Sequence, residues 1–206
     1  MVLIKPDAIK NSLTGYILSR FSEFHTGLRF AALKVVAVNL ALAEEHYAEH
    51  KGKFFYPSLL EYIRGYLHYP DEPSKRRVIA IIYRGPNAIK NIREICGNTN
   101  PHEARAQRPG CIRSLGTIIP LYDAKGKFIG DRSDNLIHAS ANIQDAEREI
   151  KLWFLPTDIP PTVRSYPAET SKEYYYYKNG AISSEYTPGS YCFIGPGDLV
   201  WKSDMK

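Results

Sequence analysis

The order of strand-like and helix-like segments constrains the fold of this chain more than any other feature of its sequence. The clearest strand is the apolar run at 77–83, which is closed by Gly85-Pro86. The other segments are a strand at 2–4, a helix at 14–25, a strand at 28–38, helices at 43–49 and 58–67, a helix at 87–96, a strand at 136–138 and a helix at 143–153. This alternation predicts an α+β fold, namely a ferredoxin-like βαββαβ sandwich with an antiparallel four-stranded sheet.

Three stretches lie outside that alternation. Residues 114–131 contain a strand–turn–strand pattern with its turn at 123–126, so we expect an inserted hairpin there. The polar stretch 98–109 is expected to be a loop. From these patterns we expect one domain at 1–154 and a C-terminal extension at 155–206.

The C-terminal extension is rich in Pro, Tyr and Gly, and we expect it to pack on the domain or on a neighbouring subunit. Asn179-Gly180, between tyrosine-rich and β-prone flanks, predicts a hairpin turn. The four tyrosines at 174–177 are either a binding surface or packing contacts, and packing is the more common role of such residues.

Composition narrows the functional classes. The longest apolar run, Val78 to Tyr83, is too short to span a membrane. Residues 1–7 lack a basic leader and a long apolar segment, so we expect no signal peptide. Cys96, Cys111 and Cys192 have no CxxC spacing, so we expect a reducing, cytoplasmic location without a thiolate metal site. Residues 51–113 carry 12 Lys and Arg against 5 Asp and Glu, and such a surplus favours a polyanion or the phosphates of a nucleotide.

No GxxxxGK[ST] or GxGxxG motif is present, so phosphates would have to be bound by side chains and a metal ion. Lys5, Arg93, Thr99 and Arg113 all lie at the ends of predicted elements, where ligand sites form. His46 and His50 are spaced to share a helix face and to bind zinc, but a solvated helix face without metal is the expected role. His138 is either a core or capping residue, a ligand or a nucleophile.

Several short stretches, in this order along the chain, resemble those of nucleoside diphosphate kinases. They are 3-LIKPDAIK-10, 46-HYAEHKGKFFYPSL-59, 91-NIREICGNTNP-101, 109-PGCIR-113, 135-NLIHASAN-142 and 147-EREIKLWF-154. The resemblance covers Val2 to about Phe154. It implies that His138 accepts a phosphate, that Glu149 orients its ring, and that Ser140 provides the neighbouring hydroxyl.

The resemblance also implies a nucleotide site around this histidine. Three cations match the family's phosphate ligands: Lys5, Arg93 and Arg113, of which Lys5 also belongs to the catalytic set. Thr99 and Tyr47 match the family's hydroxyl donors. Asn135 matches the residue that contacts the sugar, and Phe55 and Leu59 match the residues that contact the base. An imidazole that is neutral near pH 7 has a lone pair with which to attack a phosphate without a separate base. Magnesium would be held through the nucleotide's phosphates, without protein ligands.

The chain departs from the family's pattern at several points. Ala139 and Ala141 stand where the family has glycine and an acidic residue, and alanine at 139 disfavours a positive φ, so we expect altered geometry there. The insertion borders the cationic side of the expected cleft, where it would narrow access or change the preferred nucleotide. The resemblance implies that the protein assembles as a hexamer or a tetramer. The 155–206 extension would affect the contacts between subunits of such an assembly.

These features predict a nucleoside diphosphate kinase that passes the γ-phosphate of a nucleoside triphosphate to a nucleoside diphosphate through His138, in a ping-pong mechanism. One alternative is a catalytically weakened nucleotide-binding or regulatory module on the same fold. Another is a protein that binds nucleic acid through a basic surface. Because Arg93 and Arg113 already have a place in the first hypothesis, the last is the least favoured.

Overall fold

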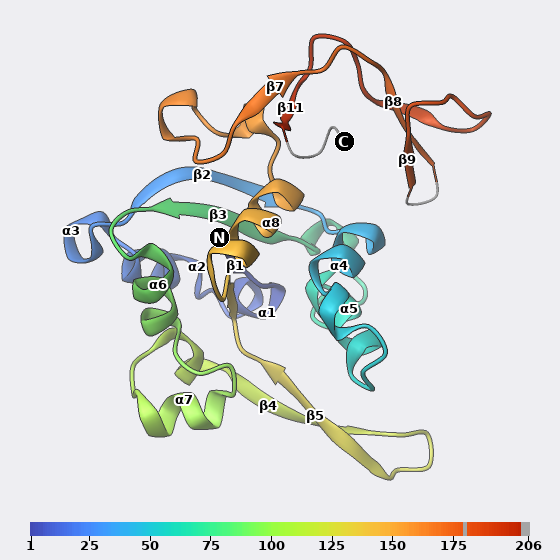
Figure 1. Cartoon of the computed structure of the whole chain (residues 1–206). Coiled ribbons are helices and arrows are strands. Elements are labelled where there is room, and N and C mark those ends of the chain that lie inside the picture. Colours follow the sequence, from blue (N-terminus) through green and yellow to red (C-terminus); the bar gives the residue numbers. More distant parts are fainter. Residues whose placement is uncertain (179–180, 203–206) are drawn as a thin grey trace. The chain divides into compact units, whose positions relative to one another are not determined.

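A four-stranded antiparallel sheet lies at the centre of residues 1–150 (Figure 1). Its strands are β1 (Val2–Ile4), β2 (Arg29–Val36), β3 (Val78–Arg84) and β6 (Ile137–Ala139), in the spatial order β2-β3-β1-β6. The computed structural model describes residues 1–178 and 181–202 and divides the chain into two units, 1–150 and 151–206. The α+β class predicted from the order of elements is confirmed.

One face of the sheet carries most of the apolar core. Because side chains alternate along a strand, Val2 and Ile4 point to the same face as their cross-strand partners Ala139 and Ile137. All four are buried in a cluster with Ile17 of the helix that follows, and with residues of the helix after β3. This packing fixes the register of β6 against β1.

The register places His138 on the opposite face, because it pairs with Leu3 between those two core positions. Helix α8 (Ile143–Trp153) begins soon after β6. Asn142 caps this helix, since its side chain accepts a hydrogen bond of 2.8 Å from the Asp145 N–H. Because α8 follows β6 so closely in the sequence, His138 of the strand and one face of the helix lie close together.

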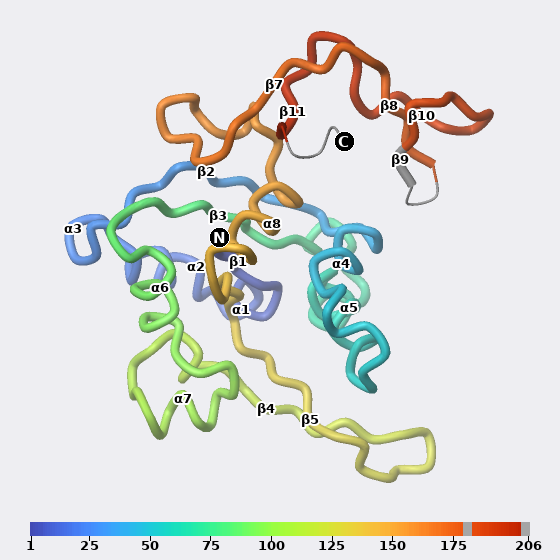
Figure 2. The backbone as a smooth tube through the Cα atoms, viewed as in Figure 1, coloured from blue at the N-terminus to red at the C-terminus, as the bar shows by residue number. Residues whose placement is uncertain are grey.

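The remaining helices of this unit surround the sheet (Figure 2). They are α1 (Pro6–Lys10), α2 (Thr14–Arg20), α3 (Glu23–Thr26), α4 (Leu40–His46), α5 (Tyr56–Ile63), α6 (Ala88–Cys96) and α7 (Pro101–Gln107), with 3-10 turns η1 (Ala48–His50), η2 (Pro73–Lys75) and η3 (Ile112–Leu115). No helix in the described part of the chain is long and apolar enough to cross a bilayer. The helix predicted at 14–25 is two helices, because the chain turns out of helical geometry at Ser22 (ψ 138°).

The prediction of a loop at 98–109 is wrong, because α7 occupies most of it. Asn100 caps this helix by accepting a hydrogen bond of 2.9 Å from the His102 N–H, and Pro101 stands at the first helical position. Only Pro101 and Ala104 of the helix are buried, so the apolar spacing that marks longer helices is missing. The capping residues were the available signal.

The predicted insertion is a hairpin of β4 (Thr117–Tyr122) and β5 (Phe128–Asp134) that extends away from the sheet (Figure 1). Its turn lies at 123–126, where the Asp123 carboxylate accepts hydrogen bonds from the N–H groups of Lys125 and Lys127. From Asp134 the chain runs almost directly into β6 (Figure 2). The base of the hairpin is therefore only two residues away from the strand that carries His138.

Residues 151–206 form the second unit, which begins within α8 and contains η4 (Pro156–Asp158) and η5 (Pro161–Val163). β7 (Ala168–Thr170) pairs with β11 (Leu199–Trp201), and β10 (Tyr191–Ile194), β8 (Tyr175–Lys178) and β9 (Ala181–Ser183) form a second sheet in the order β10-β8-β9. The Trp201 indole N–H donates to the Phe154 carbonyl at 2.8 Å. Tyr177 packs on Tyr191, with ring centroids 5.3 Å apart. The Asn179-Gly180 turn lies outside the described residues, and packing of this unit on the domain or on a neighbouring subunit stays a prediction.

Gly97 tests how tightly the segment after α6 is packed. We expect Gly97→Ala to lower the free energy of unfolding by about 2 kcal/mol or more, because φ is +82° and a Cβ would lie 2.3 Å from Cys111 Sγ. Gly126→Ala is the matched control: its φ is +77° but nothing lies within 4 Å of the added Cβ. Urea unfolding would show the difference, and equal losses for the two variants would contradict this packing.

Candidate active site

A cleft of about 550 Å³ lies where β1, the α4–α5 pair, the 97–113 segment, the inserted hairpin and α8 meet. Ten of the eleven predicted site residues line it: Lys5, Tyr47, Phe55, Leu59, Arg93, Thr99, Arg113, Asn135, His138 and Glu149. Ser140 does not line the cleft and is buried beside it, 3% exposed. The structure thus brings together residues that lie far apart in the sequence.

His138 and Glu149 form the centre of the cleft. The imidazole Nε2 lies 2.8 Å from Glu149 Oε1, and the other carboxylate oxygen accepts a hydrogen bond of 2.5 Å from the Ser140 hydroxyl. The Glu149 side chain is 4% exposed, whereas the histidine side chain is 20% exposed. Since a buried carboxylate accepts hydrogen bonds, the Nε2–H tautomer satisfies it. Nδ1 is then the ring nitrogen with a free lone pair.

The surroundings keep this imidazole neutral. Burial lowers the pKa of His138 well below its ordinary value, and the nearby positive charges of Lys5 and Arg113 lower it further. A neutral ring keeps its lone pair at neutral and mildly acidic pH. The same arrangement that favours an incoming anion therefore maintains the nucleophilic form of the histidine.

Lys5 and Arg113 are two buried cations held by a hydrogen-bonded frame. Lys5 Nζ donates to Asn135 Oδ1 at 2.7 Å, and Asn135 Nδ2 donates to the Thr99 carbonyl at 2.9 Å. The Arg113 guanidinium donates to the carbonyls of Ile137, at 3.1 Å, and Gly97, at 2.9 Å. Burial lowers the pKa of Lys5 to about 8 and lowers that of Arg113 as well. Neither cation is matched by a carboxylate within ion-pair distance in the described residues, which suits a site that receives an anion.

The backbone turns sharply between Asn135 and His138. Leu136 has φ +69°, which is unusual for a residue other than glycine, and its N–H donates to Asp7 Oδ2 at 2.9 Å. Ala139 lies within β6, paired with Val2, and has no positive φ. The absence of a positive φ is as expected of an alanine, and a difference from the family's geometry at Ala139 stays a prediction.

The prediction for His46 is also wrong, because its side chain is not on a solvated helix face. His46 is 2% exposed, and its ring centroid lies 4.6 Å from that of His138. α4 ends at His46, so His50 lies on a separate turn. Within the described residues, His46, His138 and Glu149 are the one group of three His, Cys, Asp or Glu with ligand atoms within 4.8 Å of one another. Two nitrogens and a carboxylate suit zinc better than magnesium.

The opposite end of the cleft is more apolar. Phe55 and Leu59 at the start of α5 are half-buried there. The buried Tyr47 hydroxyl has no hydrogen-bond partner within the described residues, and burial raises its pKa, so it stays protonated as a donor. Arg93 and Thr99 are exposed at the rim.

The structure adds lining residues that the sequence analysis did not assign to the nucleotide site: His46, Arg148, Leu121, Asp131, Arg132 and Ser133. Arg148 of α8 donates to the Glu45 carbonyl at 3.0 Å and so ties α8 to α4. The last four belong to the hairpin. In the sequence, these four hairpin residues were indicated only by the position of the insertion, which lies next to Asn135.

Comparison with known proteins identifies relatives of residues 1–159, which match the family model described as nucleoside diphosphate kinase. The chain is 37% identical over 158 residues to the nucleoside diphosphate kinase of Thermus thermophilus, covering 77% of this chain and 96% of that protein. It is 40% identical over 154 residues to that of Mycobacterium tuberculosis, covering 75% and 94%.

Solved structures give the same result. The Aquifex aeolicus nucleoside diphosphate kinase has a TM-score of 0.60 at 31% identity, covering 77% of this chain and 96% of that one. A transition-state mimic of the Borrelia burgdorferi nucleoside diphosphate kinase, with bound vanadate and ADP, has a TM-score of 0.58 at 30% identity, covering 80% and 90%.

The tautomer of His138 can be measured directly. We expect ¹⁵N NMR to show a protonated Nε2 and a bare Nδ1 from pH 8 down to well below 6.5, because Glu149 holds Nε2 and burial disfavours the charged ring. Glu149→Ala should allow both tautomers. A wild-type ring that is protonated on both nitrogens near pH 6.5, or on Nδ1 alone, would contradict this geometry.

Proposed function

Because the chain belongs to the nucleoside diphosphate kinase family over residues 1–159, we propose that it is a nucleoside diphosphate kinase. It takes the γ-phosphate of a nucleoside triphosphate onto His138 and passes it to a nucleoside diphosphate. The single observation that carries this mechanism is the bond of 2.8 Å between His138 Nε2 and Glu149, which leaves Nδ1 available to a phosphate in the cleft.

In the first half-reaction, Nδ1 attacks the γ-phosphorus. The new N–P bond forms as the bond to the β–γ bridging oxygen breaks, and the nucleoside diphosphate leaves with that electron pair. Positive charge on the ring is stabilised through Nε2–H by Glu149, which Ser140 in turn orients. In the second half-reaction the terminal oxygen of another diphosphate attacks the phosphohistidine, and the neutral ring returns.

Cations provide most of the remaining catalysis, because negative charge develops on the oxygens of the transferring phosphoryl group. We assign Lys5, Arg113 and Arg93 to the phosphates, with Thr99 and Tyr47 as hydroxyl donors. The hydrogen bond from Lys5 to Asn135 supports this assignment, because it holds the ammonium at the cleft without neutralising it. Lys5 and Arg113 are already held by hydrogen bonds within the protein, which lowers the cost of reorganisation when a nucleotide binds.

The nucleoside end is assigned to the apolar part of the cleft. Phe55 offers its ring face to the base, with Leu59 beside it, and Asn135 contacts the sugar through the second lone pair of its amide oxygen. Because every base has a π-face, stacking by itself discriminates little between nucleosides.

Magnesium fits this site as a companion of the nucleotide. The one cluster of metal-ligand types within the described residues is nitrogen-rich and includes the nucleophile, so we assign no protein ligand to Mg²⁺ and place it on the phosphates. When bound, it neutralises part of the phosphate charge. The cationic residues of the chain then neutralise the remainder of the phosphate charge.

Assembly and topology are proposed on the same basis. The spatial order β2-β3-β1-β6 is the order of a ferredoxin-like sandwich, which we propose for residues 1–154. β2 is at the edge of the sheet and exposes Phe30, Leu33 and Val35, which supports a homo-oligomer, a hexamer or a tetramer by family resemblance. The proposed location is the cytoplasm.

The rival functions have less support. A weakened regulatory module was suggested by Ala139 and Ala141, yet Ala139 continues β6 without a positive φ. Part of the basic surplus in 51–113 is used within the fold: Arg64 pairs with Glu61 at 2.7 Å, and Arg105 donates to the Ser114 carbonyl at 2.7 Å. These two arginines are therefore not free to contact a nucleic acid without losing bonds within the fold.

Labelling tests the mechanism. Incubation with γ-³²P-ATP and Mg²⁺ should give acid-labile label on the protein, and unlabelled GDP or CDP should discharge it. His138→Ala should carry no label, whereas His102→Ala, an exposed histidine on α7, should label normally. Absence of label on the wild type would favour the binding module, and label on His138→Ala would remove the assignment of the nucleophile.

Lys5 predicts an alkaline limit to activity. Its pKa is lowered to about 8 by burial, so it is charged below that pH and loses its charge as the pH rises through it. We expect kcat/KM, which reports the free enzyme, to fall above about pH 8, and kcat to fall at higher pH, because bound phosphates stabilise the ammonium. Lys5→Arg, whatever its absolute rate, should lose the decline. A wild-type kcat/KM that is flat to pH 9.5 would contradict this role.

A further inference from the structure

The Lys5 ammonium is supported by an amide and by an aromatic ring. It donates to Asn135 Oδ1 at 2.7 Å, and it lies over the ring of Tyr62, 5.0 Å from its centroid. Tyr62 is 1% exposed, and the attraction between a cation and an aromatic face is strongest where water is excluded. The amide and the ring together determine where the ammonium stands in the cleft.

His68 contacts both of these supports from outside the cleft. Its Nε2 lies 2.8 Å from Oδ2 of Asp134, the residue directly before Asn135 in the sequence. Its ring centroid lies 5.2 Å from that of Tyr62, with an angle of 54° between the two planes. His68 is buried, belongs to the segment between α5 and β3, and does not line the cleft. One residue behind the site therefore connects the ring to the segment that carries the amide.

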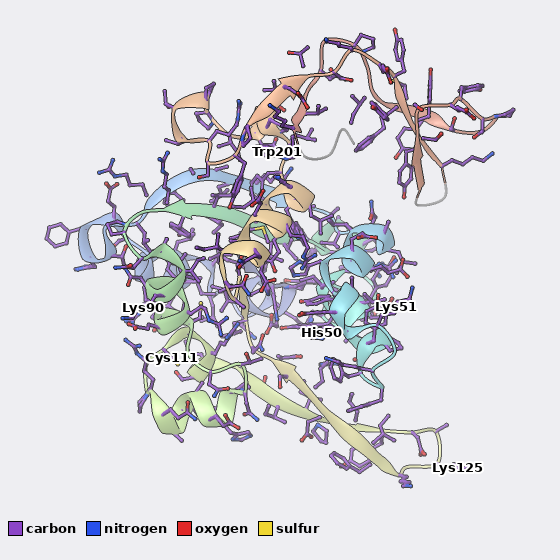
Figure 3. All side chains as sticks on the ribbon, viewed as in Figure 1. His50, Lys51, Lys90, Cys111, Lys125 and Trp201 are labelled. Carbon is purple, nitrogen blue, oxygen red and sulfur yellow. The ribbon has the colours of Figure 1, made fainter. Side chains whose placement is uncertain are left out.

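Asp134 is a firm point of attachment for this histidine. Arg132 Nε and Nη2 donate to its two carboxylate oxygens at 2.7 and 3.1 Å. Burial by itself would raise the pKa of Asp134, but the hydrogen bonds from His68 and Arg132 outweigh it and lower the pKa. A buried carboxylate that stays charged depends on its donors. Lys125 stands at the far tip of the hairpin (Figure 3), so this carboxylate lies at the opposite end, where β5 leads towards β6.

Only one nitrogen of the His68 ring has a hydrogen-bonding role in the described part of the chain. The Nε2–H group donates to Asp134, whereas the buried Nδ1 has no hydrogen-bond partner there. The backbone of His68 is tied separately, because its carbonyl accepts from Lys10 Nζ at 2.8 Å. The ring is thus oriented by the carboxylate, while its backbone is tied to α1.

We propose that His68 is a positioning residue that sets the place of the Lys5 ammonium in the cleft. It acts through Asp134, which precedes Asn135, and through the ring of Tyr62. The inference rests on the proposed nucleoside diphosphate kinase function and deepens it, since His68 itself touches no substrate. Phosphoryl transfer depends on the placement of cations, and a displacement of about 1 Å at such a site can cost about a hundredfold in rate.

The experiment compares His68→Gln and His68→Asn with the wild type, by the rate at which γ-³²P-ATP labels each protein in a single turnover. The glutamine amide reaches as far as Nε2 and can donate to Asp134, whereas the asparagine amide ends near the position of Nδ1. We expect His68→Asn to slow labelling about tenfold, and His68→Gln to stay within about threefold of the wild type. Equal losses in the two variants would contradict a role for the bond to Asp134.

A double-mutant cycle with Lys5→Met tests whether His68 acts through Lys5. In the Lys5→Met background, His68→Asn should slow labelling by no more than about twofold, because the group that it positions is gone. A loss of about tenfold in both backgrounds would overturn the inference, since the effect would then not pass through Lys5. If urea unfolding shows that His68→Asn does not fold, His68→Phe takes its place in the cycle, because phenylalanine keeps a ring against Tyr62 and lacks the donor.

Arg76→Met is the matched control for loosening of the segment between α5 and β3. Arg76 lies in that segment, donates to the Tyr69 carbonyl at 2.8 Å and does not line the cleft. Its loss removes a bond from the segment without touching Asp134 or Tyr62. We expect Arg76→Met to label at the wild-type rate, and a slowing equal to that of His68→Asn would mean that loosening alone explains the effect.

Failure of the proposed function is a separate result, because the wild type would then take no label on His138. A wild type that labels normally, together with a folded His68→Asn that labels at the same rate, rejects the role of His68 and leaves the proposed function intact.

Discussion

The carboxylate of Glu149 is the interaction on which the site depends. One oxygen holds His138 Nε2 at 2.8 Å and the other accepts from Ser140 at 2.5 Å, in surroundings that leave the glutamate side chain 4% exposed. A buried carboxylate without both partners would be costly, so the ring, the hydroxyl and the helix that carries the acid position one another. That mutual constraint leaves a single ring nitrogen to face the cleft.

The charges around His138 and Glu149 favour the binding of an anion. Lys5 and Arg113 are buried and face the cleft through amide and carbonyl partners, and the imidazole beside them stays neutral. Positive charge that is not compensated within the protein is costly until a phosphate arrives. The site thus keeps part of its binding free energy for the substrate, and the lowered pKa of Lys5 is the measurable consequence.

The inserted hairpin shows how a long addition can reach the site without disturbing the sheet. It leaves the core after η3 and returns through Asp134 directly into β6, so its base is anchored by the same segment that carries Asn135 and His138. A loop of this length is tolerated because its closure costs little more than a short one. It lies beside Phe54, next to the apolar end of the cleft to which we assigned the nucleoside.

Sequence alone determined the alternation of strands and helices, because apolar periodicity is a local property. Short motifs that resemble the family's pointed to His138 and Glu149, which the structure brings within 2.8 Å of each other. The sequence did not reveal α7, whose few buried positions leave no apolar stripe, nor the burial of His46 against His138. It also did not identify Arg132, because nothing local indicates that Asp134 and His68 hold its side chain at the cleft. The tertiary structure decided these points, because each of them depends on how segments that are distant in the sequence pack against one another.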